Sequence, residues 1–400
     1  MIIRSHANTG MLHLFSALVA CGLVAAILFV GRTIAIHVEQ STLPSTAPEL
    51  FSLKNQGLAF QRAAARAQDV LPLYGSSELV IPPVPEKASR FFRTAPTGFQ
   101  VSPVGKLGAT SLTILQKFGA LSSDLRGKNV VISLSPEWFL VQVTRWDWYK
   151  GNFSLLAASE MTFGSALDFQ LKRDIALRML QCPSTLEKSP LLEFALRRLA
   201  SGSWLDRVFF CALWPIGKTQ IALLELQDHF AALSYILHDI KPTPRRHLEM
   251  INWSELVAQT ERKTVDQNKN EQKALDLDEQ IAPGRRDAGF LKRMDAAPGW
   301  IDLELLLRVL ARIQARPLLL SMPIAGQSYD QRGVSRKARE SYYKRMRTVA
   351  QRYQFPLVEF EDHDNDSAFL DSQEDHLTGK GWMFYDRVLD DFFHGRIPPI

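Results

Sequence analysis

The chain has 400 residues, of which 46% are hydrophobic and 22% are charged, and its formal net charge at neutral pH is +5. This length and composition indicate a globular protein with a large core, built as one large domain with an insertion or as two domains. The small positive charge is spread along the chain. It fits attraction to an anionic lipid or envelope polymer and gives no argument for nucleic-acid binding.

The amino-terminal segment has the pattern of a membrane anchor. From Met11 to Gly31 the chain contains no Asp, Glu, Lys or Arg, and the run matches one bilayer crossing in length. A cleaved signal peptide is the alternative, but the apolar run is longer than in such peptides and no convincing cleavage site follows. We therefore expect an uncleaved anchor over residues 1–35 and a Pro-, Ser- and Thr-rich linker over residues 36–50. Arg4 and Arg32 flank the run almost evenly, which leaves its orientation open.

The two ends of the remaining chain alternate between helical and strand patterns. In residues 51–154 we expect helices over Ser52–Gln68 and Ser111–Leu125 and strands over Val70–Tyr74 and Asn129–Leu134, with Pro72 an awkward residue for a strand. In residues 296–400 we expect helices over Ile301–Ile313 and Ser335–Tyr353 and strands over Pro317–Met322 and Phe355–Phe360. This alternation predicts an α/β layer sandwich with a parallel sheet.

Residues 155–295 separate these two halves, and we interpret them as an inserted helical subdomain followed by a charged loop. Leu155 to Leu237 is mostly helical in period, whereas Glu261 to Asp295 is charged and poor in large apolar side chains, as in a solvated helix or loop. The apolar run from Val208 to Ile216 is too short to span a bilayer, and Lys218 follows it. A buried helix or contact with a membrane surface are its two interpretations.

The sequence gives little support for a disulfide bond or for a metal site. Cys182 and Cys211 can form a disulfide only if their Cα atoms are close, and two buried free thiols are the simpler expectation. The nearest metal-like cluster is His363–Asp366, which we interpret as a solvated acidic loop, so we expect no metal site.

A serine and a histidine are the candidate catalytic residues. Gly75, Ser76 and Ser77 follow the first expected strand as a small, sharply turning step that exposes a hydroxyl at a strand end. Serine needs a base within hydrogen-bond reach, and His376, just ahead of an amphipathic helix, can supply one. The alternative is structural: the serines cap the helix that begins near Glu78, and His376 only flanks another helix.

Four sequence blocks, in order, resemble the DltD family: GSSEL at Gly75–Leu79, Gly127–Phe139, Pro317–Asp330 and Asp375–Trp382. The resemblance implies an SGNH-hydrolase-like three-layer α/β fold on the outer side of the cytoplasmic membrane. It also implies a part in D-alanine esterification of teichoic acids, beside a membrane-bound O-acyltransferase and a D-alanyl carrier protein, with an anionic envelope polymer as acceptor and no cofactor.

The resemblance also assigns roles to the candidate residues. Ser77 takes the place of the nucleophile, His376 that of the base, and Ser76 that of an Asp in the SGNH turn. The family places the triad Asp three residues before the histidine, but Gln373 stands there in this chain. Asp371, Glu374 and Asp375 are the remaining candidates for the acid, and we expect Asp371.

An acyl-transfer site also needs donors for the oxyanion. Gly105 and Gly108 precede a helix in a loop where backbone N–H groups can approach a ligand, Gly108 being the better placed, although both can be ordinary loop glycines. By resemblance, Ser135 lies near the position of an Asn donor in SGNH enzymes. A serine acyltransferase or esterase is the expected activity. The alternative is a non-catalytic envelope scaffold that recruits the acyltransferase or the carrier protein.

Overall fold

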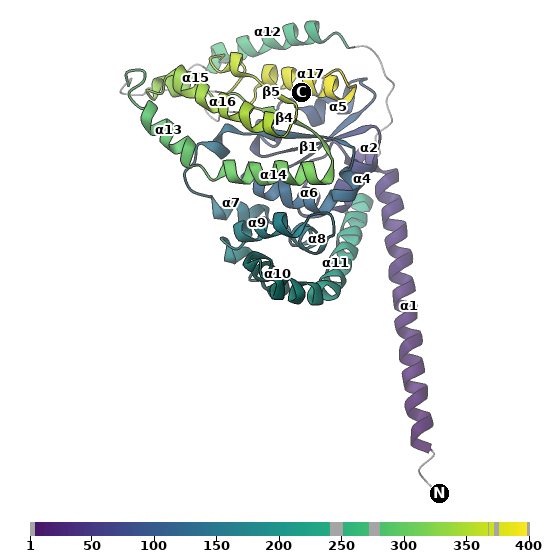
Figure 1. Cartoon of the computed structure of the whole chain (residues 1–400). Coiled ribbons are helices and arrows are strands. Elements are labelled where there is room, and N and C mark those ends of the chain that lie inside the picture. Colours follow the sequence, from purple (N-terminus) through teal and green to yellow (C-terminus); the bar gives the residue numbers. More distant parts are fainter. Residues whose placement is uncertain (1–4, 241–250, 272–280, 367, 372–375, 398–400) are drawn as a thin grey trace.

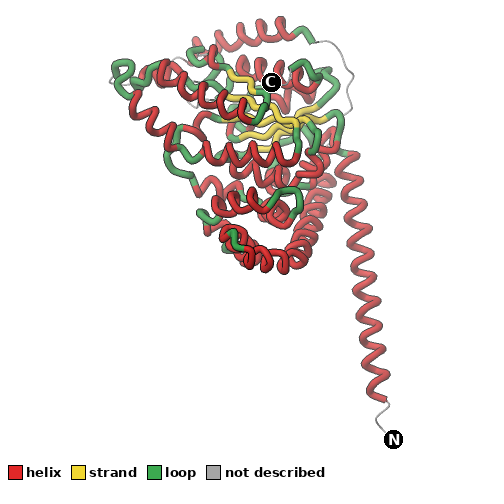
Figure 2. The backbone as a smooth tube through the Cα atoms, in the orientation of Figure 1, coloured by secondary structure: helices red, strands yellow, loops and turns green. Residues whose placement is uncertain are grey.

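The computed structural model describes residues 5–240, 251–271, 281–366, 368–371 and 376–397. A twisted sheet lies in the middle of the main body, with helices on both of its faces, and one long helix, α1 (Ser5–Ser41), projects away from that body (Figures 1 and 2). The predicted α/β class is therefore confirmed.

Within the described residues, five parallel strands form one sheet in the order β2-β1-β3-β4-β5. The strands are β1 (Val70–Gly75), β2 (Gln100–Gly105), β3 (Asn129–Leu134), β4 (Arg316–Ser321) and β5 (Leu357–Glu359). The chain order reverses between β1 and β3, and in open α/β sheets ligands bind beyond the carboxyl ends of the strands at such a reversal. The topology therefore indicates where a site belongs.

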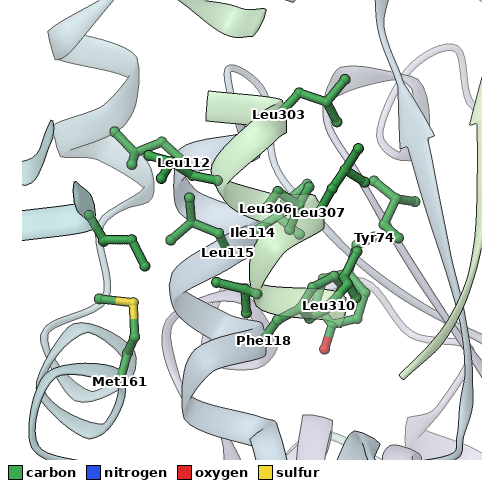
Figure 3. Packing of buried hydrophobic residues seen from close by; sticks show 14 of the residues in the cluster. Tyr74, Leu112, Ile114, Leu115, Phe118, Met161, Leu303, Leu306, Leu307 and Leu310 are labelled. Atoms are coloured by element: carbon green, nitrogen blue, oxygen red, sulfur yellow. The ribbon is translucent and has the colours of Figure 1, made fainter. Parts of the chain in front are cut away.

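Alternate strand residues supply two hydrophobic layers, because successive side chains of a strand point to opposite faces. In β3, Val130 and Ile132 belong to the layer under α6 (Ser111–Leu125), α8 (Leu155–Phe163), α14 (Gly299–Ile313) and α16 (Arg336–Arg352), part of which Figure 3 shows. Val131 belongs to the layer under α5 (Ala88–Thr94) and α17 (Gly379–Phe393). β1 to β4 are thus buried on both faces, as is usual in parallel sheets, whereas the edge strand β5 is half-buried.

The predicted strands and helices are mostly present, with three differences. The edge strand β2 was not predicted. The helix expected over Ser52–Gln68 is two helices, α3 (Ser52–Gln56) and α4 (Ala59–Arg66), because the chain turns at Gly57. The stretch interpreted as a solvated helix or loop contains α13 (Asp287–Ala296), whose Phe290 and Met294 are buried, so that interpretation was wrong for these residues.

Pro72 is accommodated in β1 by the way this strand pairs. The ladder between β1 and β3 begins at Leu73, one residue after the proline, and Pro72 lies opposite Ser102 of β2. A proline has no N–H to donate. The pairing with β3 therefore starts where donors are again available.

The segment predicted as a linker contains a short helix, α2 (Leu43–Thr46), with Thr46 and Ala47 buried. The Lys54 ammonium donates hydrogen bonds to the carbonyl oxygens of Ala47 (2.6 Å), Glu49 (2.7 Å) and Thr46 (3.3 Å). Burial lowers the pKa of Lys54 to about 7. The end of α1 therefore connects to the body through a compact, hydrogen-bonded segment.

The inserted helices lie on the α6 side of the sheet. They are α9 (Phe169–Met179), α10 (Pro190–Ser201) and the 36-residue helix α11 (Trp204–Asp239), preceded by α7 (Trp146–Asn152). Helix α12 (Trp253–Glu271) lies on the opposite side, where the Trp253 indole N–H donates to Asp390 of α17 at 2.9 Å (Figure 1). Cys182 is buried and Cys211 is exposed, and both are free, so the expectation that both are buried thiols was wrong for Cys211.

Polar contacts fix α11 against α1 and α4. The Glu39 carboxylate of α1 lies 2.8 Å from the His229 ring in a buried pair, and Glu225 of α11 pairs with Arg62 of α4 and, at 3.8 Å, with Arg32 of α1. One carboxylate oxygen of Asp228 accepts hydrogen bonds from two backbone N–H groups at the start of α4, both at 2.7 Å. These contacts define the α1–α4–α11 junction, which sets the direction in which α1 leaves the body.

Candidate active site

The turn after β1 presents Ser77. Gly75 ends the strand, Ser76 is buried, and Ser77 begins a short 3-10 helix (Ser77–Leu79) with its side chain partly exposed. The Ser76 N–H donates to the Glu78 carboxylate at 2.9 Å, which holds the turn closed. A small polar step at the carboxyl end of a central strand thus carries the predicted nucleophile toward the open edge of the sheet.

Close packing explains the two glycines beside this turn. A Cβ atom on Gly105 would lie 2.6 Å from the Gly75 carbonyl oxygen of the neighbouring strand, and one on Gly75 would lie 2.2 Å from the Glu78 carboxylate. Real Cβ atoms do not approach so closely. Gly75 and Gly105 therefore allow the ends of β1 and β2 to meet directly below the turn.

His376 reaches the same region from the carboxyl-terminal part of the chain. Its carbonyl oxygen accepts a hydrogen bond from the Asp371 N–H at 2.7 Å, and the neighbouring residues Leu370 and Leu377 form an antiparallel bridge. Thr378 caps α17 by accepting from the Gly381 N–H at 3.3 Å. These contacts close the base of the loop and place the histidine just before the helix.

One pocket, of about 200 Å³, collects residues from three strand ends. Ser77 after β1, Ser135 after β3 and His376 before α17 all line it. The segment after β4, together with Tyr329 of α15 (Gly326–Gln331), forms another wall, which includes Met322, Pro323, Ile324 and Ala325. The pocket therefore lies where the sheet topology predicts a site, at the reversal between β1 and β3.

The other sequence candidates lie outside this lining. Ser76, Gly105, Gly108 and Asp371 are not among the described residues that line the pocket. Gly108 has a φ of +74°, and a Cβ atom there would lie 2.7 Å from the Trp148 ring, so the position suits glycine for reasons of backbone and packing. Glu374 and Asp375 lie outside the described residues. The roles of Asp371, Gly105, Gly108 and Ser76 remain predictions.

Glu78 is a pocket residue that the sequence did not identify as part of the site. It is buried, and burial raises the pKa of its carboxyl, while the Ser76 N–H and the nearby Lys87 ammonium act in the opposite direction. Lys87 is buried as well, and its pKa is lowered to about 8, chiefly by burial. Groups near its carboxyl include Ser133 of β3 and Tyr385 of α17, both distant in the sequence, so the motif alone gave no signal of this burial beyond the capping pattern Ser-Ser-Glu.

The part of the chain that the structure describes holds no group of three or more His, Cys, Asp or Glu side chains placed to bind a metal ion. His363 and Asp366 do lie together, 3.3 Å apart, and the His363 ring stacks on Phe369. This pair packs against the loop that leads to His376.

The fold and the pocket define a parallel α/β protein with a serine and a histidine at the carboxyl edge of its sheet. Comparison with known proteins then gives the family. The family model described as DltD protein matches residues 47–394, and the chain therefore belongs to the DltD family.

Three relatives agree with this assignment, and all three bear the name Protein DltD. The protein of Bacillus subtilis (strain 168) is 26% identical over 393 residues, which cover 93% of this chain and 96% of that relative. The protein of Staphylococcus aureus (strain NCTC 8325 / PS 47) is 22% identical over 369 residues, 90% of each chain. The protein of Lacticaseibacillus rhamnosus is 23% identical over 399 residues, 94% of this chain and 89% of the relative. The assignment made from the four sequence blocks is confirmed, and it associates the chain with D-alanylation.

Proposed function

We propose that the protein is a membrane-anchored serine acyltransferase that esterifies an envelope polymer with D-alanine through an acyl-Ser77 intermediate. One observation carries the proposal: Ser77 and His376, far apart in the sequence, line one pocket at the carboxyl edge of the sheet. Membership of the DltD family supplies the chemical class of the transferred group.

The proposed reaction has two halves. In the first, His376 takes the proton of the Ser77 hydroxyl as its oxygen attacks the acyl carbonyl of the donor, and the histidine returns that proton to the leaving group. In the second, His376 takes a proton from a hydroxyl of the acceptor polymer as its oxygen attacks the Ser77 ester, and the histidine returns that proton to the departing Ser77 oxygen. Ser135, which also lines the pocket, is the candidate donor to the oxyanion, with Gly105 and Gly108 as further candidates.

Asp371 is the proposed acid that orients His376. Its N–H already bonds to the His376 carbonyl oxygen, so the two residues are adjacent across the base of the loop. A carboxylate in this role fixes the histidine tautomer and stabilises the positive charge that forms on the ring. We expect Asp371→Asn to impair acyl transfer strongly and Glu374→Gln and Asp375→Asn to have smaller effects. Full activity of Asp371→Asn together with loss in either neighbour would move the role to that neighbour.

The proposed location is the outer side of the cytoplasmic membrane, with residues 1–35 as the anchor. The described chain contains a helix long and apolar enough for this, with a candidate span over His13–Ser41. The proposed partners are the membrane O-acyltransferase and the D-alanyl carrier protein of the same system, and the acceptor is an anionic polymer. A reporter fused after Gly395 is expected to be active only outside the cytoplasm, and activity inside would contradict this topology.

The decisive experiment separates the enzyme from the scaffold. We expect Ser77→Ala and His376→Ala each to abolish D-alanine incorporation into the envelope, and the double variant to be hardly worse, because the two residues act as a unit. Chemical unfolding should show wild-type stability, since both side chains line an open pocket. Ser328→Ala, on α15 near the pocket, is the matched control and should keep full activity. Folded Ser77→Ala protein that supports full incorporation would leave recruitment as the function.

A further inference from the structure

The first half of α11 exposes a row of large apolar side chains. Between Trp204 and Ile216 they are Trp204, Leu205, Val208, Phe209 and Ile216, and Trp204 is 71% exposed. Exposed apolar patches of this extent on soluble proteins mark surfaces that meet another molecule or a membrane. This row therefore needs a partner.

The opposite side of the same helix is fixed to the protein, so the exposed row cannot turn inward. Phe210 is buried and stacks on Phe163 of α8 with ring centroids 5.6 Å apart. The Trp214 indole N–H donates to the Phe163 carbonyl oxygen at 2.8 Å, and a Cβ atom on Gly217 would lie 2.5 Å from the Phe163 ring. The helix is thus locked by one face, and the other face is presented outward.

Helix α11 contacts α1 through its second half. Phe230 of α11 packs against Gly31 of α1, within 3.2 Å of a Cβ atom placed there, next to the ion pair between Arg32 and Glu225. Figure 1 shows α10 and the first turns of α11 at the end of the body toward which the free part of α1 extends, whereas α12 lies at the opposite end. The apolar face of α11 and the apolar anchor therefore share one side of the molecule.

The length and the charges of α11 favour a helix that lies in the membrane interface over one that spans the bilayer. The apolar part, residues 204–216, is about 20 Å long, shorter than a hydrocarbon core of about 30 Å. In the second half, Glu225, Asp228 and His229 are bonded to α1 and α4, which places that half outside the lipid. The whole helix is long and apolar enough to span a bilayer. Its charged groups, however, divide it into an apolar first half and a second half that is bonded to α1 and α4.

The residues around the row suit an anionic lipid surface. Trp204 lies in it and Trp214 lies beside it, and tryptophan is enriched where lipid headgroups meet the hydrocarbon. Arg207 of α11 is exposed in the same segment, where a cationic side chain attracts anionic headgroups, whereas Arg197 of α10 is paired with Glu193.

We propose that residues 204–216 of α11 insert as an amphipathic helix into the headgroup region of the bilayer that holds α1, giving the protein a second, interfacial membrane contact. The proposal rests on the proposed anchoring of α1. Together with α1, this contact fixes the tilt of the body over the membrane, and therefore the direction in which the Ser77 pocket opens.

The chain offers native probes for the test. Cys21 lies exposed in the anchor, Cys211 lies exposed in the apolar part of α11, and Cys182 is buried. In full-length protein, Cys21→Ala leaves Cys211 for an environment-sensitive label, and Cys211→Ala leaves Cys21. Both substitutions combined with Lys337→Cys place the label on the exposed face of α16 as a control. The proteins are reconstituted into vesicles of phosphatidylglycerol and phosphatidylcholine with brominated acyl chains.

We expect the label on Cys211 to be quenched several-fold more than the label at position 337 and less than the label on Cys21, at a depth of about 5–10 Å below the headgroups. Replacing Phe209 and Ile216 by serine should remove most of the quenching at Cys211. Leu237→Ser, at the other exposed end of α11, should leave it unchanged.

The remaining outcomes separate the inference from the proposed function. Strong quenching at Cys21 with control-level quenching at Cys211 would overturn the inference and leave the anchor in place. Absence of quenching at both would overturn the anchor and the inference together. A blue shift at Cys211 without quenching would overturn the inference in favour of contact between two copies of the chain.

Discussion

The body of the protein and the α1–α4–α11 junction combine apolar and polar interactions in different proportions. The body packs apolar side chains on both faces of the sheet, with the Tyr74 and Phe118 rings edge to face 4.6 Å apart. The junction has a small apolar cluster between α4 and α11 and adds to it the buried Glu39–His229 pair and the Asp228 cap of α4. Apolar packing stabilises without direction, whereas charged hydrogen bonds demand one geometry. The comparison teaches that the core maintains the fold and the junction sets the orientation of α1.

The largest effect is expected in the core. Phe118 is fully buried, so Phe118→Ala should lower the free energy of unfolding by about 3–5 kcal/mol through lost burial and a cavity. Chemical unfolding of the full chain in detergent, followed by tryptophan fluorescence, measures this loss. Leu107→Ala, at a half-exposed position, is the control and should change the value by less than about 0.5 kcal/mol. If Phe118→Ala lowered the free energy of unfolding less than the junction variants described below, the comparison would be contradicted.

The second prediction concerns how the free energy of unfolding depends on pH. It tests the role of Lys54 in the segment that joins α1 to the body. The folded pKa of Lys54 is about 7, below its value of 10.5 in the unfolded chain, so between these values the unfolded state binds more protons. The titration of Lys54 should therefore raise the free energy of unfolding by about 2 kcal/mol between pH 7 and pH 9. Burial lowers the pKa of Lys87, Lys117 and Lys172 to about 8, so these lysines add to the rise in the same range. Lys54→Met should reduce the total rise by its own share of about 2 kcal/mol. An equal rise in the wild type and in this variant would show that Lys54 does not titrate in this range.

A smaller effect is expected from the cap of α4. Asp228→Ala leaves the N–H groups of Leu58 and Ala59 without their carboxylate, which should cost about 1 kcal/mol. Gly57→Ala should cost at least as much, because the new Cβ atom would lie 1.7 Å from the Asp228 carboxylate and displace it. Gly151→Ala adds a Cβ atom that meets nothing within 4 Å and serves as the control. Chemical unfolding at one pH compares the three variants. If Asp228→Ala and Gly57→Ala were as stable as the control, the cap would not stabilise the protein.

The smallest effect is expected for the exposed pair between Arg32 and Glu225. These groups lie 3.8 Å apart, and the Arg32 side chain is 42% exposed, so water screens their attraction. Arg32→Gln should change the free energy of unfolding by less than about 1 kcal/mol. Added salt should reduce even this difference, and a larger loss that is insensitive to salt would assign Arg32 a further role in the junction.

Local patterns predicted most of the fold, because apolar β-branched runs and helical periods each lie within one element. They missed β2, where Ser102, Pro103 and a terminal glycine weaken the strand pattern at the edge of the sheet, a position that tolerates proline. They also extended one helix through Gly57, because the carboxylate that caps the second helix comes from Asp228, far along the chain. The features that local patterns missed are therefore those that depend on contacts with residues distant in the sequence.

The candidate site was predictable to a similar degree. The turn at Ser77 and the block around His376 were visible as motifs, and the pocket unites them with Ser135. The burial of Glu78 was not predictable, since it requires strands and helices from several parts of the chain around one side chain. The choice among three acids depends on how a loop folds back, which spacing alone does not determine.

The continuous course of α1 has a consequence for the proposed reaction. The helix has 37 residues and is about 55 Å long, and after Ser41 the chain enters α2 and the carbonyl groups held by Lys54, all close to the body. Under the proposed anchoring of α1, the pocket therefore stays at a set height above the bilayer and does not swing out on a tether. The proposed donor and acceptor must then both be delivered to that height, so the length of α1 would limit which envelope polymers reach Ser77.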